Sequence, residues 1–112
     1  MSKKVKAAAS WDVKEKLYED LLDPSYAAAY VNGALLEGDE VVFKTAVADV
    51  IRARGVGKVA EAAGVNRVTI FKTLKPETRT SFTTYHSLLM ACGIDFATRP
   101  IRPKPRSRSA KE

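Results

Sequence analysis

The chain has few of the residues that build disulfides, metal sites and many catalytic centres. Cys92 is the only cysteine and His86 the only histidine among 112 residues. A single cysteine excludes an intrachain disulfide, and Cys92 ends an apolar run in which it is expected to be a small core residue. His86 and Cys92 are six residues apart, which is not a metal-ligand spacing. We therefore expect no metal site and a reducing environment.

The longer motifs of catalysis and of membrane insertion are also missing. The sequence contains no glycine-rich phosphate-binding loop and no nucleophile elbow, so we expect neither enzymatic activity nor a cofactor. No apolar run approaches the roughly eighteen residues that a membrane helix needs. The charged start, Met1–Lys6, is followed by no secretory apolar stretch. These absences together predict a cytoplasmic protein.

Positive charge is plentiful and unevenly distributed. The chain has 19 basic and 13 acidic residues, a formal net charge of +6 and a pI near 9.6. Residues 11–51 hold nine acidic and three basic residues, whereas residues 52–81 hold seven basic and two acidic residues. An acidic half followed by a basic half favours two partners of opposite charge. Chance clustering on a solvated surface is the alternative interpretation.

The apolar pattern predicts one all-α domain, a bundle of five or six helices. We expect a flexible basic N-terminus over residues 1–10, the helical domain over 11–98, and a disordered basic tail of proline, arginine and serine over 99–112. The expected helices outside the central pair cover residues 13–22, 24–37, 40–54 and about 82–92. Weak alternation in Ile94–Thr98 predicts a short strand, which pairs in a dimer or lies as an extended tail.

Capping residues and apolar stripes set the expected helix starts and buried faces. Asp12, Asp23 (followed by Pro24) and Asp39 are the expected N-caps. The residues expected to be buried are Val13, Leu17, Leu21 and Leu22, then Ala27, Tyr30, Val31, Ala34 and Leu35, then Val42, Phe43, Ala46, Val50 and Ile51, and near the end Phe82, Tyr85, Leu88, Leu89 and Cys92.

The rest of the chain is organised around Val56–Leu74, which reads as two short helices joined by a tight turn. Ala60 is small enough to let the helices approach, Gly64 can take the left-handed conformation that ends the first helix, and Asn66 can cap the second. Ile70, Phe71 and Leu74 are expected to give the second helix its buried face. This spacing is typical of a helix-turn-helix, whose second helix enters the DNA major groove. A generic helical hairpin is the alternative.

The second helix of such a motif presents its first turn to base edges. Arg67 can make a bidentate contact to guanine and Val68 can lie beside a thymine methyl group. Thr69 and Lys72 can reach bases or phosphate. The residues expected to contact phosphate are Arg54, Lys58, Asn66, Lys75 and Arg79. In the alternative interpretation these polar side chains are solvated and Val68 packs on a neighbour.

Three blocks of the sequence resemble bacterial addiction-module antidote proteins of the HigA-like kind, helix-turn-helix proteins related to the Xre and phage-repressor type. The blocks are Leu21–Asp39, Val59–Leu74 and Leu88–Ile94, within about residues 11–97. The resemblance implies an antitoxin that binds its own operator DNA as a homodimer and neutralises a RelE-like mRNA-endonuclease toxin. Thr73 departs from the usual helix-turn-helix pattern, which has an apolar residue there, and residues 77–81 lack the Gly-Asn-Pro often seen after this helix in the family.

RNA-cleaving toxins of this class are basic, so the acidic N-terminal half is the expected toxin-binding surface. The candidate residues are Trp11, Glu15, Glu19 and Asp20, although Trp11 can instead pack back as a hydrophobic staple. Two other functions remain open. One is a stand-alone repressor of the phage type, and the other is a protein-interaction module whose helix-turn-helix no longer binds DNA.

Overall fold

The computed structural model describes residues 13–101, and this part of the chain contains six helices and no strand. The helix of residues 13–21 comes first. It is followed by α2 (Pro24–Leu36), α3 (Glu40–Arg54), α4 (Val56–Ala63), α5 (Arg67–Thr73) and α6 (Phe82–Ala91). The predicted all-α fold is thus confirmed. The expectations for residues 1–10, for Trp11 and Asp12, and for residues 102–112 lie outside the described part.

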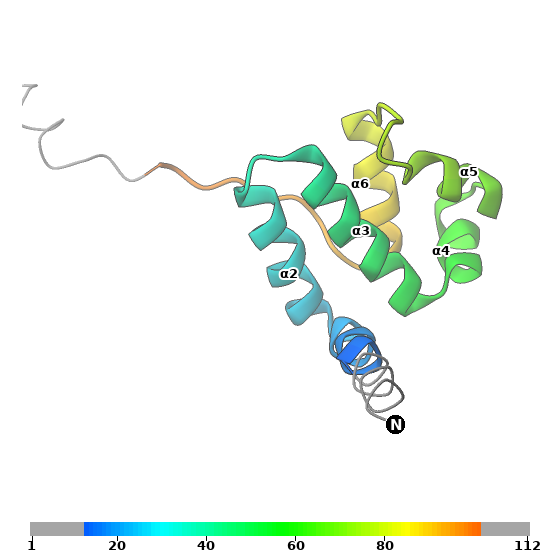
Figure 1. Ribbon diagram of the computed structural model, residues 1–112, viewed down its shortest axis with the longest axis horizontal. Coiled ribbons are helices and arrows are strands. Elements are labelled where there is room, and N and C mark those ends of the chain that lie inside the picture. Colours follow the sequence, from blue (N-terminus) through cyan, green and yellow to red (C-terminus); the bar gives the residue numbers. More distant parts are fainter. Residues whose placement is uncertain (1–12, 102–112) are drawn as a thin grey trace, which may run out of the picture.

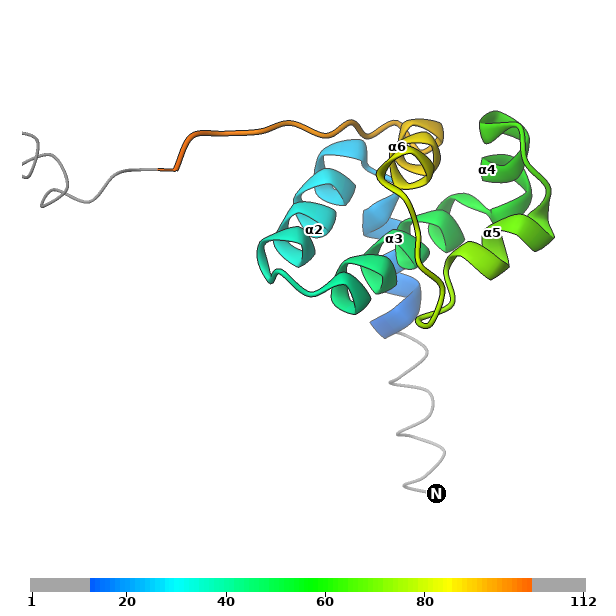
Figure 2. The same cartoon turned by 90° about the horizontal axis from the view of Figure 1, so that it is seen from above.

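The helix α3 occupies the middle of the arrangement (Figure 1). It packs against α2 and against α4, and α4 in turn packs against α5 and α6. After α6 the chain runs back as an extended segment past α2, as the view from above also shows (Figure 2). The α4–α5 pair therefore lies on one side of α3, and α2 lies on the other.

One apolar core joins all six helices. Its largest fully buried side chains are Leu21, Ile51, Ile70, Leu89, Val47, Val50, Val59 and Cys92. Cys92 is confirmed as a core residue, and its burial raises the pKa of its thiol to about 11, so that the thiol stays protonated at neutral pH. None of the helices within residues 13–101 has the combined length and apolar character needed to cross a membrane.

Six apolar residues that were expected to be buried are exposed, which corrects the predicted faces. They are Val13, Leu22, Leu35, Val42, Phe71 and Phe82, with 38% to 68% of their surface accessible. Helical rotation explains two of them directly. Val42 precedes the buried Phe43, and Phe71 follows the buried Ile70, so a turn of about 100° per residue carries each to the rim of the buried face.

The weak alternation in Ile94–Thr98 gives two expectations, a strand paired in a dimer or an extended tail, and within the described chain the segment lies as the extended tail (Figure 1). Residues 94–101 form no ladder, because every element beside them is a helix and a strand needs a neighbouring strand. The alternating apolar residues of this segment instead pack against the helices. Ile94 is buried, and Phe96 packs half-buried against the same core. These two side chains fasten the extended segment to the helices.

Local capping chemistry sets the helix starts as predicted. The Asp23 carboxylate accepts a hydrogen bond from the Ser25 amide at 3.0 Å, and the Asp39 carboxylate accepts one from the Val41 amide at 2.8 Å. Each satisfies a backbone N–H group that has no partner inside its helix. The starts of α2 and α3 are therefore encoded within three residues of sequence.

Two tyrosine–carboxylate hydrogen bonds join α3 to its neighbours. Tyr30 Oη of α2 donates to Asp49 Oδ2 at 2.7 Å, and Tyr85 Oη of α6 donates to Glu40 Oε2 at 2.8 Å. Burial raises the pKa of both tyrosines to about 12, and the bonds to the carboxylates add to the shift. Ionisation of either hydroxyl removes its donated proton and places two negative charges together.

The free energy of unfolding should therefore fall as the pH rises from 10 toward 12. In the unfolded chain these tyrosines ionise near pH 10, whereas the folded state holds the protons of Tyr30 and Tyr85 up to about pH 12. The stabilisation is complete below pH 10 and is lost as the pH passes through the folded pKa. Urea unfolding at about pH 9, 10 and 11 measures it. The double variant Tyr30→Phe/Tyr85→Phe should depend less on pH, and an unchanged slope would contradict the assignment.

Candidate nucleic-acid interface

The turn between α4 and α5 is short and is held by its own backbone chemistry. Gly64 has φ 74° and ends α4, in a left-handed conformation that is costly for a residue with a Cβ atom. The Val65 amide donates back to the Ala60 carbonyl at 3.0 Å. Asn66 Oδ1 accepts from the Thr69 amide at 2.8 Å and caps α5. The predicted roles of Gly64 in ending α4 and of Asn66 in capping α5 are thus confirmed.

Two residues attach α5 to the core. Ile70 is fully buried, and Leu74, half-buried, packs against the same cluster. Thr73 occupies the position at which the usual helix-turn-helix pattern has an apolar residue. It is half-buried, and its carbonyl accepts a hydrogen bond from Thr80 Oγ1 at 3.0 Å. Leu74 therefore contributes packing that Thr73 does not, while Thr73 connects α5 to the loop that follows.

The outer face of α5 combines cations with apolar side chains. All four predicted base-reading residues, Arg67, Val68, Thr69 and Lys72, are exposed. Phe71, which was expected in the buried face, is 47% exposed and lies three positions after Val68, so the two are neighbours on the helix surface. Periodicity alone did not identify Phe71 as a surface residue. The sequence does contain one indication of its exposure, because Phe71 directly follows Ile70 and a helix turns by about 100° per residue.

A buried lysine of α3 supports the end of α5. Lys44 is 2% exposed, and its Nζ donates to the Lys75 carbonyl at 2.8 Å and to the Thr78 carbonyl at 2.5 Å. A buried ammonium group needs such acceptors, and a cation complements the carbonyl end of a helix. In the sequence, Lys44 stands out only as a charge in the acidic half. The structure makes it the clamp between α3 and the loop after α5.

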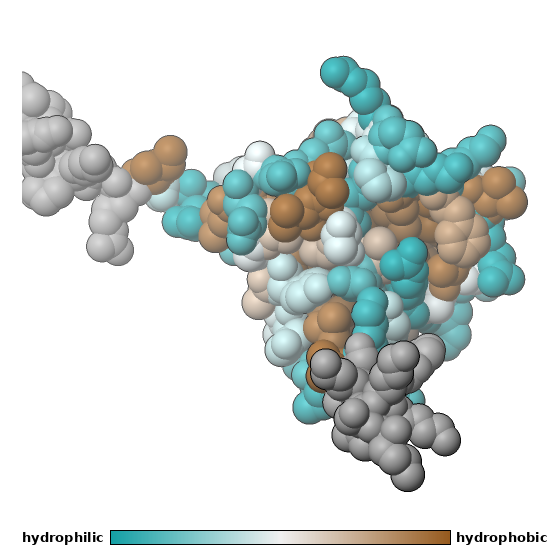
Figure 3. Space-filling model, viewed as in Figure 1, coloured by the Kyte–Doolittle hydropathy of each residue, from teal (hydrophilic) through white to brown (hydrophobic). Residues whose placement is uncertain are grey.

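The phosphate-contact candidates do not all lie together. Lys58 on α4 and Lys75 and Arg79 after α5 are exposed, as is Asn66, whose Oδ1 caps α5. Arg54 differs from them, because its Nη2 donates to the Leu22 carbonyl at 3.3 Å. The structure thus places the Arg54 guanidinium against the turn after the first helix. Hydrophilic side chains (teal) surround apolar surface (brown) in the region of α4 and α5 (Figure 3).

The acidic candidates occupy the first helix, which lies apart from α5 in both ribbon views (Figures 1 and 2). Glu15 and Glu19 are exposed one turn apart. Asp20 accepts a hydrogen bond from Lys16 Nζ at 3.1 Å, which partly offsets its charge. Trp11 lies outside the described residues. The acidic and basic candidates therefore occupy separate surfaces.

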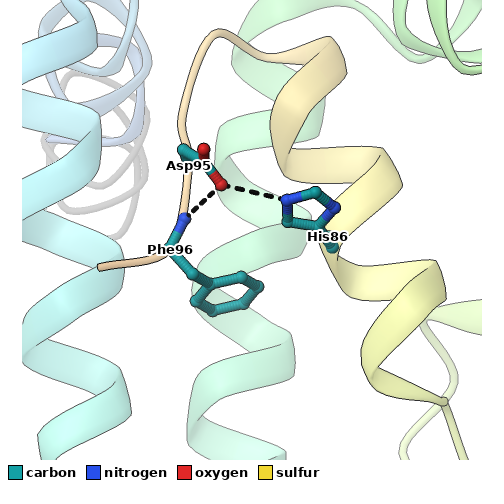
Figure 4. A network of polar contacts seen from close by, with 3 residues as sticks. All are labelled: His86, Asp95 and Phe96. Atoms are coloured by element: carbon teal, nitrogen blue, oxygen red, sulfur yellow. Dashed lines mark hydrogen bonds and ion pairs between the residues drawn. The ribbon is translucent and has the colours of Figure 1, made fainter. Parts of the chain in front are cut away.

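The single histidine has a structural partner. His86 Nε2 lies 3.0 Å from Asp95 Oδ1, which also accepts the Phe96 amide at 2.7 Å (Figure 4). The imidazole stacks with the rings of Phe82 and Phe96. The network fastens the segment after α6 to that helix. Residues 13–101 contain no group of three or more His, Cys, Asp or Glu side chains placed to hold a metal ion.

Comparison with known proteins adds a family assignment to this geometry. A family model described as "Probable addiction module antidote protein" matches residues 9–100. That range includes all six helices of the described part and the whole α4–α5 pair. Searches of curated proteins and of solved structures gave no match.

Proposed function

The chain belongs to the family described as "Probable addiction module antidote protein", and we propose that it neutralises a toxin and represses its own operon by binding operator DNA. The antidote role rests on the family match over residues 9–100. The DNA-binding role rests on the α4–α5 pair. The two roles use separate surfaces in this proposal, so both partners can be bound at once.

The observation that carries the DNA-binding proposal is the short, capped turn that leaves a basic face of α5 exposed. Gly64 and Asn66 hold the turn, and Arg67 and Lys72 project from the exposed face. A helix-turn-helix needs this arrangement to place its second helix in the major groove. In this interpretation Arg67 contacts guanine. Thr69 and Lys72 reach bases or phosphate. The phosphate contacts come from Lys58, Lys75, Arg79 and the side-chain NH2 group of Asn66.

Replacing Arg67 tests the base contact. We expect Arg67→Ala to weaken binding to promoter DNA by about 1–3 kcal/mol and to relax the preference at one base pair, because a bidentate contact to guanine is lost. Fluorescence anisotropy with labelled promoter fragments measures both effects. Lys14→Ala removes one positive charge from the first helix, away from α5, and is the matched control. Equal affinities of the two variants would show that Arg67 does not read a base.

For the toxin partner we propose a RelE-like mRNA endonuclease encoded by an adjacent gene, docked on the acidic first helix. Glu15 and Glu19 are exposed there, whereas the charge of Asp20 is partly offset by Lys16. Such a surface is complementary to a basic protein. Trp11, which lies outside the described residues, is kept as a candidate toxin contact on the ground of the sequence alone.

Co-expression with the adjacent gene tests the toxin role. Wild-type protein should rescue growth and co-purify with the toxin, whereas Glu15→Lys/Glu19→Lys should do neither while still binding promoter DNA. A wild-type protein that fails to rescue growth would refute the antidote role. Full rescue by the double variant would instead show that the toxin docks elsewhere.

We further propose a homodimer of the HigA-like, Xre-related type. A two-fold dimer presents two copies of α5 to half-sites about one helical turn, roughly 34 Å, apart. Analytical ultracentrifugation should therefore give a dimer, and footprinting should protect two related half-sites. A monomer that protects a single site would favour a stand-alone repressor. Failure to bind DNA at all, with toxin binding retained, would favour an interaction module.

A further inference from the structure

We propose that Phe71 and Val68 form an apolar pair on α5 that reads the methyl groups of adjacent thymines. This inference rests on the proposed DNA binding and specifies what the exposed face of α5 recognises. Val68 is 61% exposed and Phe71 47%. Side chains three positions apart on a helix are surface neighbours, so the two side chains present adjoining apolar surface to solvent.

Cations border this apolar pair along the helix. Arg67 lies four residues before Phe71, and Lys72 lies four residues after Val68, and both are exposed. Residues four apart share a helix face. The apolar pair therefore lies between positive charges, an arrangement that is complementary to a polyanion with apolar groups on its surface.

Phe71 is not needed to attach α5 to the core of the folded chain. Ile70 is the buried residue of α5, and Leu74 adds the second packing contact, so the helix is anchored without Phe71. Fully burying a phenylalanine contributes about 1.5–3 kcal/mol relative to leaving it exposed. About half of the Phe71 surface remains accessible in the structure. It lies beside Val68, so a ligand can cover both side chains.

Thymine is the base that supplies an apolar group in the major groove. Its C5-methyl group lies on the same edge as the acceptors and donors that identify the other bases, and side chains such as phenylalanine contact it. Successive bases of one strand are about 3.4 Å apart along the axis. An aromatic ring and an isopropyl group side by side can therefore cover the methyl groups of two adjacent thymines.

Uracil isolates this contact, because it replaces the methyl group by hydrogen and keeps the same base pairing. Promoter DNA of the chain's own operon, amplified with either dTTP or dUTP, gives two probes of equal charge and length. Burial of one methyl-sized group corresponds to about a fourfold change in affinity. Wild-type protein should therefore bind the uracil probe about 15-fold more weakly for each half-site at which both methyl contacts are lost.

The variants separate Phe71 from general effects of uracil. Phe71→Ala should reduce the discrimination to about fourfold per half-site, the part that Val68 supplies, and Phe71→Leu should keep most of it. Met90→Ala removes an exposed apolar side chain from α6 (51% accessible) and is the matched control, with full discrimination.

The possible failures are distinguishable. Equal wild-type affinity for the two probes, or the same discrimination in wild type and Phe71→Ala, overturns the methyl contact and leaves DNA binding standing. Failure of the wild-type protein to bind either probe overturns the proposed DNA binding and this inference with it. Circular dichroism confirms that each variant is folded.

Discussion

Ile70→Ala is expected to lower the free energy of unfolding by about 2–5 kcal/mol, the usual range for truncating a fully buried isoleucine. Ile70 is 0% exposed and is the buried residue of α5. It also borders a hollow of about 200 Å³ together with Ala63 of α4 and Leu88 of α6. Truncation enlarges this space at the point where three helices meet, so the cost combines lost burial with a cavity.

Most small domains are stable by about 5–15 kcal/mol, so this loss is a large part of the total. Urea unfolding followed by circular dichroism measures it, and we expect the proposed DNA binding to weaken with it, because α5 loses one of the two residues that attach it to the core. Val68→Ala is the control on the same helix. Val68 is exposed, so its truncation should change stability by less than about 0.5 kcal/mol while weakening DNA binding. Equal stability losses in the two variants would show that α5 is not anchored as described.

Lys44→Met should lower the free energy of unfolding by about 2 kcal/mol and weaken DNA binding. The variant keeps the length and apolar stem of the side chain but leaves the Lys75 and Thr78 carbonyls without the donor found in the structure. Hydrogen bonds to charged groups contribute about 1.5–3 kcal/mol each. Removing the buried ammonium also relieves its desolvation cost, so the net loss is smaller than two such bonds.

We expect Lys44→Met to affect the proposed DNA binding only indirectly, through the position of α5. Its two acceptors lie in the loop that begins directly after α5, so amide hydrogen exchange in residues 75–81 should accelerate in the variant. Lys14→Met removes an exposed lysine from the first helix and should change neither stability nor exchange. If Lys44→Met matched this control, the clamp between α3 and the loop would have no energetic role.

Helix boundaries and the turn were predictable because they depend on neighbours within about four residues. Asp23 and Asp39 bond to amides two residues ahead, and Asn66 bonds to one three residues ahead. Gly64 ends α4 through its own backbone conformation. Such contacts join residues that are close in sequence, so the amino-acid sequence is sufficient to identify the α4–α5 pair and its exposed Arg67.

Burial at the edges of the helix faces was less predictable. Val42, Phe71 and Phe82 are apolar and close to the correct period, yet all three are exposed. Periodicity gives the direction of a buried stripe but not its width, which depends on how far the neighbouring helix extends over it. The alternation in Ile94–Thr98 left two outcomes open for a related reason, because alternation does not show whether a partner strand is present.

The amino-acid sequence alone specifies the helices, their caps, the tight turn and the resemblance to antidote proteins, because these features arise from nearby residues or from the order of motifs. The tertiary structure decided what Lys44, Arg54 and Phe71 do. Lys44 reaches carbonyls 31 and 34 residues away, and Arg54 reaches one 32 residues away. Contacts of this range depend on which helix faces meet in the folded chain, and helical period does not encode that pairing.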